Sequence, residues 1–411
     1  MKKFTLFIIF LTVFIDMLGV GVLIPIYPLI ISSNNNFSIL TANHISADSG
    51  YIILGWLSAS YPLMQFFFTP ILGQTSDLMG RKKILLISII GSIIGYLIFA
   101  YAVSLKSIYF MFFARILDGI SGGSIAVGMA SIADISDSKN RAKNFGIIGV
   151  AFGLGFILGP TIGGYLSNSE LSSWFQITTP FYFLSILGIV NFLLIYFIFA
   201  ETLINNSKGS IKILQSISNL YQAYQNKELS NFLIIIFLFI FGFCLFTNFW
   251  GVTLVNYFHY SQSQITNIFA YTGIWIMIGQ GIIVRKISGN VQAKKILPIC
   301  LCLEGSCIVT MYFIPINYSQ LIYIICTILP VSHAIDVVFC NSFLVSNFTN
   351  DNNRGQIIGI NTSVQCLATA LPAIVGGYIA KSFTQTHILT ILSGAIIIVS
   401  GIMFKKTWSQ H

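Results

Sequence analysis

Long apolar runs separated by short polar stretches make up almost the whole chain. Twelve runs are each about 20 residues or longer, the length at which an α-helix crosses a hydrocarbon layer of about 30 Å. The pattern predicts an all-α membrane protein with twelve transmembrane helices. The runs lie near residues 4–31, 49–72, 84–103, 108–133, 144–168, 178–200, 230–258, 264–284, 296–314, 319–346, 356–381 and 387–404.

One long polar connection divides these runs into six and six. It covers residues 201–228, whereas the other connections are short. We therefore expect an N-terminal six-helix bundle in residues 1–200, a cytoplasmic linker in 201–228 and a C-terminal six-helix bundle in 229–411.

The two halves share sequence features at one fixed offset. Arg141 to Gly146 reads R-x-x-x-x-G, and the same pattern recurs 213 residues later, from Arg354 to Gly359. The tripeptide Gly163-Gly164-Tyr165 recurs at the same offset. Because 213 residues is about half of the chain, these matches indicate an internal repeat that relates the two six-helix bundles.

Composition and charge agree with a membrane protein. Of the 411 residues 55% are hydrophobic and only 8% are charged, with a mean hydropathy of +0.85, which excludes a soluble surface. The net charge of +9 lies in short loops, so it indicates topology and no nucleic-acid partner. If every second loop is assigned to the cytoplasmic side, all but three of the 21 Lys and Arg lie in the cytoplasm. The exceptions are Arg115, Lys106 and Lys381.

The same assignment places both termini inside the cell and the chain in the inner membrane. The first apolar run is too long for a signal-peptide core and has no obvious cleavage site, so we expect it to remain as a span. The seven cysteines fall within apolar runs without metal-type spacing. We interpret them as packing residues, and we expect no disulfide, metal or cofactor.

The loop between the second and third runs reads G-Q-T-S-D-L-M-G-R-K-K. Gly73 and Gly80 permit a tight turn, and Asp77 can approach a helix N-terminus. Arg81 and Lys82 are typical of a loop that stays in the cytoplasm.

This spacing of glycine, acid and bases resembles the signature loop of the major facilitator superfamily of transporters. The resemblance covers nearly the whole chain, and it implies two six-helix halves with a substrate site at their interface near mid-membrane. It also implies a conformational latch in which Arg81 pairs with an acid near Asp134 and Arg141, while Asp77 faces the start of the eleventh helix near Gln356. A plain surface charge cluster is the alternative.

The first span carries an acid about twelve residues, or roughly 18 Å, inside the helix. Burying the carboxylate of Asp16 in lipid would cost at least about 2.5 kcal/mol, so it should face a cavity or a partner. The pattern D-x-x-G-x-G-x-x-x-P-x-x-P from Asp16 to Pro28 resembles the first helix of the drug:proton antiporter branch. We expect Asp16 to couple transport to protons; a structural cap or pair is the alternative.

The fourth span contains the sequence R-x-x-D-G. Arg115 and Asp118 lie on one helical face, where their charges can neutralise each other. The resemblance implies that Arg115 is linked to proton movement. Asp118 departs from the family pattern, in which Gln often stands, and it is either a second titratable group or half of a fixed ion pair.

The fifth span gives the direction of transport that we expect. Its sequence G-x-x-x-G-P-x-x-G-G resembles the antiporter signature of the exporter branch, although small-residue helix packing alone would explain the glycines. The ending Glu201-Thr202-Leu203 after the sixth span resembles the same branch. We therefore favour export over uptake. The signature residues are Gly155, Gly159, Pro160, Gly163 and Gly164.

Further acids lie in the C-terminal half. Glu304 is about eight residues, roughly 12 Å, inside the ninth span, at a place similar to a proton-coupling acid of tetracycline:proton exporters. His333 and Asp336 are three residues apart on one face of the tenth span. They are either a proton relay or a structural hydrogen bond.

Polar and aromatic positions in several spans are candidates for a substrate cavity, although each taken singly is better explained by interhelical hydrogen bonding or packing. They are Tyr27, Tyr61, Asn248, Trp250, Trp275, Gln280, Asn361 and Gln365.

These features predict a proton-coupled exporter of a drug-like compound, metabolite or siderophore that works by alternating access as a monomer. Its partners would be the small-molecule substrate, protons and the lipid bilayer. An uptake symporter and a transport-dead sensor of the same fold are the alternatives. An enzyme is not expected, because the chain has no H-E-x-x-H motif and no P-loop.

Overall fold

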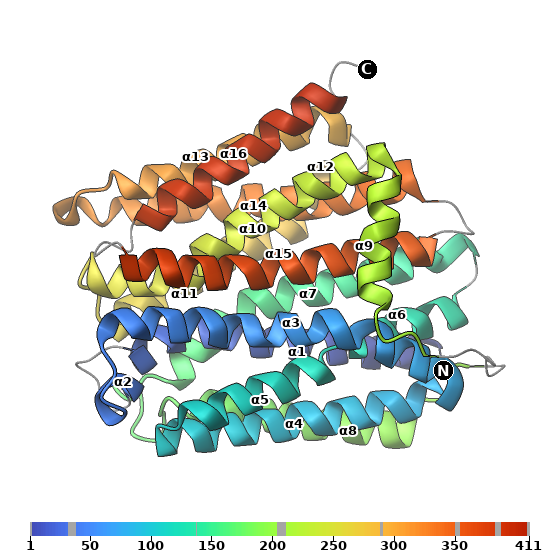
Figure 1. The fold of residues 1–411 in the computed structure, drawn as a ribbon, viewed down its shortest axis with the longest axis horizontal. Coiled ribbons are helices and arrows are strands. Elements are labelled where there is room, and N and C mark those ends of the chain that lie inside the picture. Colours follow the sequence, from blue (N-terminus) through green and yellow to red (C-terminus); the bar gives the residue numbers. More distant parts are fainter. Residues whose placement is uncertain are drawn as a thin grey trace. The chain divides into compact units, whose positions relative to one another are not determined.

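A computed structural model of the chain describes residues 2–31, 38–136, 138–203, 211–287, 291–349, 354–382 and 388–408. Within these residues, twelve helices are long and apolar enough to cross a membrane. Figure 1 shows the helical architecture. The predicted twelve-span, all-α fold is confirmed.

The chain divides into two compact units. The first contains Met1–Ile26, Asn34–His44 and Ser60–Ser218, and the second contains Tyr27–Ser33, Ile45–Ala59 and Asn219–His411. The last change of unit, between Ser218 and Asn219, falls inside the short helix α9 (Gln215–Gln225), within the expected linker. The earlier changes fall within residues 26–60, so parts of the first two spans belong to the second unit. The division into residues 1–200, 201–228 and 229–411 stays a prediction.

The helices of the first half of the chain begin and end close to the predicted runs. They are α1 (Lys2–Ile31), α2 (Ile39–Ala42), α3 (Ala47–Met79), α4 (Arg81–Leu105), α5 (Ile108–Ser121), α6 (Ser124–Ile135), α7 (Ser138–Leu166) and α8 (Thr179–Ile198).

The second half begins with α9, which precedes the remaining spans. Its elements are α9 (Gln215–Gln225), α10 (Lys227–Asn256), α11 (Gln262–Ile278), the π-helical segment η1 (Gly279–Val284), α12 (Arg285–Ile287), α13 (Ala293–Tyr312), η2 (Ile316–Tyr318), α14 (Leu321–Phe348), α15 (Arg354–Ser382) and α16 (Ile388–Trp408).

Two spans are less regular than expected. The fourth run, 108–133, is interrupted at Gly122 and Gly123, which separate α5 from α6. A Cβ atom on Gly123 would lie 3.0 Å from the backbone of Phe68, so close contact with α3 requires glycine there. The eighth run passes from α11 into the π-helical η1 before it ends in α12.

The loop around Arg81 is shorter than the sequence suggested. Helix α3 continues through Gly73 to Met79, and only Gly80, with a φ of 96°, breaks the helical path. The expected turn role of Gly73 is therefore wrong. A Cβ atom on Gly73 would lie 3.3 Å from that of Ala126, so this glycine lets α3 and α6 approach closely.

The glycine face of the fifth span packs against the first. A Cβ atom on Gly159 would lie 2.6 Å from the Cα atom of Gly21, and one on Gly163 would lie 2.6 Å from the carbonyl oxygen of Val22. A Cβ atom on Gly155 would collide with Met17. These contacts hold α7 against α1 on either side of Pro160, and Asp16 lies on the same helix α1.

A matched pair of substitutions tests this packing. Gly159→Ala should lower the thermal unfolding midpoint in detergent, because overpacking a tight contact costs about 1–3 kcal/mol. Gly149→Ala, on the same helix, meets nothing within 4 Å and should leave the midpoint unchanged or raise it. Equal effects of the two substitutions would contradict the close approach of α7 to α1.

Candidate functional site

A buried acidic side chain lies on the first helix of the first unit. Asp16 is 4% exposed, and its Oδ2 atom accepts a hydrogen bond of 2.9 Å from the hydroxyl of Ser124 on α6. Asp118 on α5 is close enough to repel it electrostatically. The ion pairs found among the described residues include none with Asp16.

Asp118, in contrast, has a matching charge. Its Oδ2 atom lies 3.0 Å from Nη1 of Arg115, and it also accepts a hydrogen bond from Ser92 on α4. The guanidinium of Arg115 lies 4.7 Å from the ring centroid of Tyr61 on α3. The structure thus brings the predicted pair together, and a cation–π contact and a hydroxyl surround it.

Tyr96 completes this cluster, and the sequence analysis did not select it. Its hydroxyl lies 3.5 Å from the carbonyl oxygen of Ile15. A Cβ atom on Gly19 would come within 2.5 Å of the same hydroxyl, so the glycine makes room for it. The sequence feature that could have identified these residues is the presence of a tyrosine and two serines, Ser92 and Ser124, in otherwise apolar spans. We call Asp16, Ser92, Tyr96, Arg115, Asp118 and Ser124 the N-half cluster.

The second unit holds a second buried cluster, formed by α13 and α14. Glu304 is fully buried, and its Oε1 atom lies 3.1 Å from Nδ1 of His333. The histidine therefore pairs with the acid of the neighbouring helix. The expected hydrogen bond between His333 and Asp336 is not the contact that the structure shows.

Asp336 is fully buried beside Glu304. The two carboxyl groups interact electrostatically. A hydrogen bond joins the carboxyl groups of Asp336 and Glu304. Apart from this contact, neither oxygen of Asp336 nor Oε2 of Glu304 has a hydrogen-bond partner among the described residues. Glu304, His333 and Asp336, which we call the C-half cluster, thus combine two acids with one imidazole in an apolar interior.

Aromatic rings cover the imidazole. The ring centroid of His333 lies 3.6 Å from that of Phe243, with an interplanar angle of 14°, and 5.5 Å from that of Phe239. Such stacking fixes the ring plane and directs Nδ1 at Glu304.

Arg81 is the centre of the signature loop. It is only 5% exposed, and its guanidinium contacts Asp77 at 2.6 Å, Asp134 at 3.1 Å and the hydroxyl of Ser76 at 2.6 Å. The structure therefore contains the expected contact between Arg81 and Asp134. Asp77 pairs with Arg81 inside the loop itself.

Glu201 holds the start of α4, a role that the sequence analysis did not predict. Its carboxylate accepts hydrogen bonds from the backbone N–H groups of Arg81 at 2.9 Å and Lys82 at 3.1 Å. Asp134 also accepts a hydrogen bond from Thr202. An acid at a helix N-terminus is favourable for the helix dipole, so this contact stabilises the loop.

Other expected members of the latch are placed differently. Gln356 donates a hydrogen bond of 2.8 Å to Gln222 on α9. Arg141 lies on α7, but its side chain is outside the described part of the structure. The latch role of these residues stays a prediction.

The candidate cavity residues have varied surroundings. Asn248 donates to the carbonyl of Cys244 on its own helix, and Trp250 packs on Phe246 in the core. Asn361 is buried, and its Oδ1 atom is without a hydrogen-bond partner among the described residues. Tyr27 is buried, whereas Trp275, Gln280 and Gln365 are half-buried. The cavity role of these residues and of Tyr61 stays a prediction.

The pairing of Arg115 with Asp118 leads to a test. Asp118→Asn would leave a buried guanidinium without its counter-charge, which typically costs about 3–5 kcal/mol. We expect a marked drop in the thermal unfolding midpoint. The double variant Arg115→Gln/Asp118→Asn should recover part of this loss, because it removes both charges. If the drop in the unfolding midpoint of the double variant equalled the sum of the drops caused by Asp118→Asn and Arg115→Gln alone, the two charges would not stabilise each other as a pair.

The sequence of the chain matches a known protein family and several known proteins. A family model described as Major Facilitator Superfamily matches residues 9–372. The chain is 36% identical to tetracycline resistance protein, class B, of Escherichia coli over 192 residues, which is 46% of this chain and 42% of that protein. It spans less than half the length of the tetracycline resistance proteins of classes B and H that it matches.

Other similarities extend over nearly the whole chain. Multidrug resistance protein 2 of Bacillus subtilis (strain 168) is 24% identical, with 99% of this chain and 96% of that protein covered. The crystal structure of the human organic anion transporter MFSD10 (TETRAN) has a TM-score of 0.74 at 20% identity, covering 98% of this chain and 99% of that one. A D-xylose-proton symporter has a TM-score of 0.75 at 16% identity, covering 97% of each chain.

Proposed function

The chain belongs to the major facilitator superfamily of membrane transporters, and on that premise we propose that it exports small organic molecules in exchange for protons. Its partners as a transporter are a small-molecule substrate and the lipid bilayer. We further propose that it acts as a monomer in the cell inner membrane with both termini in the cytoplasm.

The C-half cluster carries this proposal. Two buried acids, Glu304 and Asp336, hydrogen-bond to each other, and apart from that contact three of their four oxygens have no hydrogen-bond partner among the described residues. Two bare carboxylates side by side in an apolar interior would repel each other strongly. The cluster therefore needs a bound proton or an incoming cation to balance its charge, and His333 is positioned to exchange one with Glu304.

In the N-half cluster we assign the proton to Asp16. Arg115 and Ser92 engage Asp118, so this acid has a fixed ionic role in the proposal. Asp16 has only the hydroxyl of Ser124 and the repulsion of Asp118. Protonation of Asp16 removes that repulsion, whereas loss of the proton restores it.

The proposed cycle uses both clusters. Protons enter from outside and neutralise Asp16 and Glu304, which favours the inward-open state. Substrate then binds from the cytoplasm and displaces the protons inward, and the loaded transporter returns outward. We propose that the network of Arg81, Asp134 and Glu201 stabilises one of the two states and reopens in the other.

The direction of transport rests on similarity. The tetracycline and multidrug resistance proteins that the chain matches are named for resistance to drugs, which export explains. The glycine and proline pattern on α7 supports the same branch. The substrate class within export stays open between drug-like compounds, metabolites and siderophores.

Ligand-triggered proton release tests the coupling. The purified chain in weakly buffered detergent should release protons when a compound from a panel of tetracyclines, siderophores and amino acids binds. Asp16→Asn and Glu304→Gln should each abolish the release belonging to their cluster, because an amide does not gain or lose a proton near neutral pH. The measurement is the absorbance of a pH indicator, with binding followed in parallel by calorimetry.

The control is Glu228→Gln, which removes an acid from the first turn of α10, outside both clusters. It should release as many protons as the parental chain. Binding without proton release in the parental chain would reject the antiport mechanism in favour of a facilitator or a sensor.

A further inference from the structure

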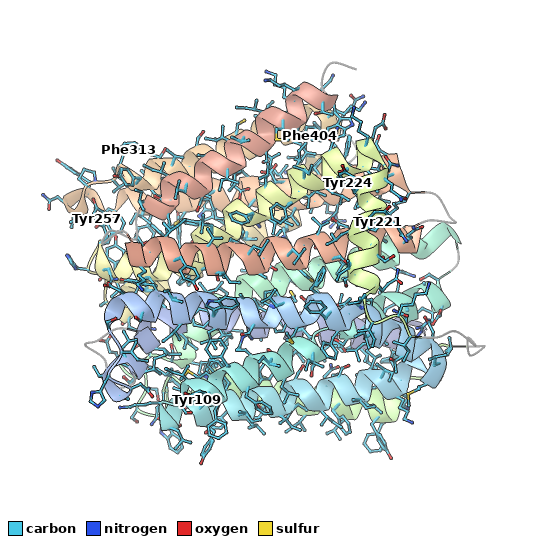
Figure 2. All side chains as sticks on the ribbon, in the orientation of Figure 1. Tyr109, Tyr221, Tyr224, Tyr257, Phe313 and Phe404 are labelled. Atoms are coloured by element: carbon cyan, nitrogen blue, oxygen red, sulfur yellow. The ribbon has the colours of Figure 1, made fainter. Side chains whose placement is uncertain are left out.

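Helix α9 has its apolar side turned outward. Leu214, Ile217, Tyr221 and Tyr224 recur at spacings of three and four residues, which places them on one side of the helix. Their exposed fractions are 60%, 49%, 65% and 78%. Figure 2 labels the two tyrosines on α9.

The opposite side of α9 faces the protein and is mixed, because polar residues alternate there with Ala223, which is buried in the core, and Leu220, which is partly buried against it. Ser216 is 1% exposed and donates a hydrogen bond to the carbonyl of Phe66 on α3. Asn219 donates at 3.4 Å to the hydroxyl of Ser363 on α15. A helix on a soluble protein buries its apolar side and exposes its polar side. Because α9 leaves its largest apolar side chains exposed, this apolar stripe requires an apolar surface outside the protein.

α9 contacts its neighbouring spans inside their ends, at Phe66, 13 residues before the second span ends at Met79, and at two residues of the eleventh span. Gln356, which bonds to Gln222, is the first residue of the eleventh span, and Ser363 lies seven residues further, roughly 10 Å along the helix. The seventh span begins at Lys227, two residues after α9 ends. Figure 1 shows α9 running across α15 instead of along it. A helix at this depth and orientation lies parallel to the membrane surface.

Lysines outnumber acids around α9, where the nearest acids are Glu201 and Glu228, the latter directly after Lys227. Residues 202–227 contain Lys208, Lys212 and Lys227 and no Asp or Glu. Lys212 and Lys227 are exposed at either end of the helix. The cytoplasmic leaflet carries anionic lipids that attract basic segments, and tyrosine favours the boundary between water and hydrocarbon.

We infer that α9 rests on the cytoplasmic surface of the bilayer and binds anionic lipid. Leu214, Ile217, Tyr221 and Tyr224 enter the boundary between headgroups and acyl chains, and Lys212 and Lys227 contact anionic headgroups. The inference rests on the cytoplasmic placement of the linker in the proposed function but not on proton coupling. The polar contacts of Ser216 and Asn219 then anchor a lipid-bound helix to the transporter.

Fluorescence quenching in the full chain tests this surface. Tyr221→Trp and Tyr224→Trp are prepared separately, and the parental chain, with its five native tryptophans, provides the background to subtract. The variants are reconstituted in vesicles of phosphatidylcholine whose acyl chains are brominated near the headgroup. These vesicles are prepared with and without added phosphatidylglycerol. We expect the brominated lipid to quench most of the added emission, and aqueous acrylamide to quench little of it.

The lysines are tested in the same vesicles. Phosphatidylglycerol should increase the quenching of the added tryptophan, and Lys212→Gln/Lys227→Gln should abolish that increase. Lys294→Gln/Lys295→Gln removes the same charge at the start of α13 and should keep the increase. Emission quenched by acrylamide and not by brominated lipid would overturn the inference, since the stripe would then face water. Emission that neither reagent reaches would also overturn it, because protein would then cover the stripe.

Discussion

A charge inside a hydrocarbon layer must find an opposite charge, a hydrogen-bond donor or a proton. The N-half cluster meets this requirement for Arg115 and Asp118 with an ion pair of 3.0 Å, a serine hydroxyl and an aromatic ring. The C-half cluster meets it only partly, because its one imidazole contacts Glu304 and leaves Asp336 with no partner but that acid. In the proposed function, this incomplete compensation of charge is what connects the fold to proton movement.

The helix packing supports both clusters in different ways. Glycines on α7 bring its backbone against α1, which positions Asp16 beside α5 and α6. In the second unit the rings of Phe243 and Phe239 fix the imidazole of His333. Outside the apolar interior, Arg81 connects the signature loop by charge to Asp134 on α6, and Glu201, just after α8, accepts backbone hydrogen bonds from the start of α4. Rigid helices thus hold a small number of groups that can change protonation.

The sequence was sufficient for the spans and for the identity of most buried acids, because spanning length and an acid in an apolar run are local properties. It was not sufficient for partners on other helices. His333 is three residues from Asp336, yet it contacts Glu304, 29 residues away, since the packing of α13 on α14 decides the pair. Gly73 resembled a turn residue, but helix propagation continued to Met79. Tyr96 and Glu201 act through contacts with α1 and α4 that no short-range pattern reveals.

Exchange of substrate for protons across a membrane is the central claim, and flux in sealed vesicles measures it most directly. Vesicles that contain the chain in one orientation, with the cytoplasmic side outward, receive an acid interior and then external tetracycline or another ligand from the binding panel. The account predicts that the compound accumulates inside while protons leave, and that Glu304→Gln stops both movements. No accumulation of the compound, or accumulation that does not depend on the pH gradient, would contradict it.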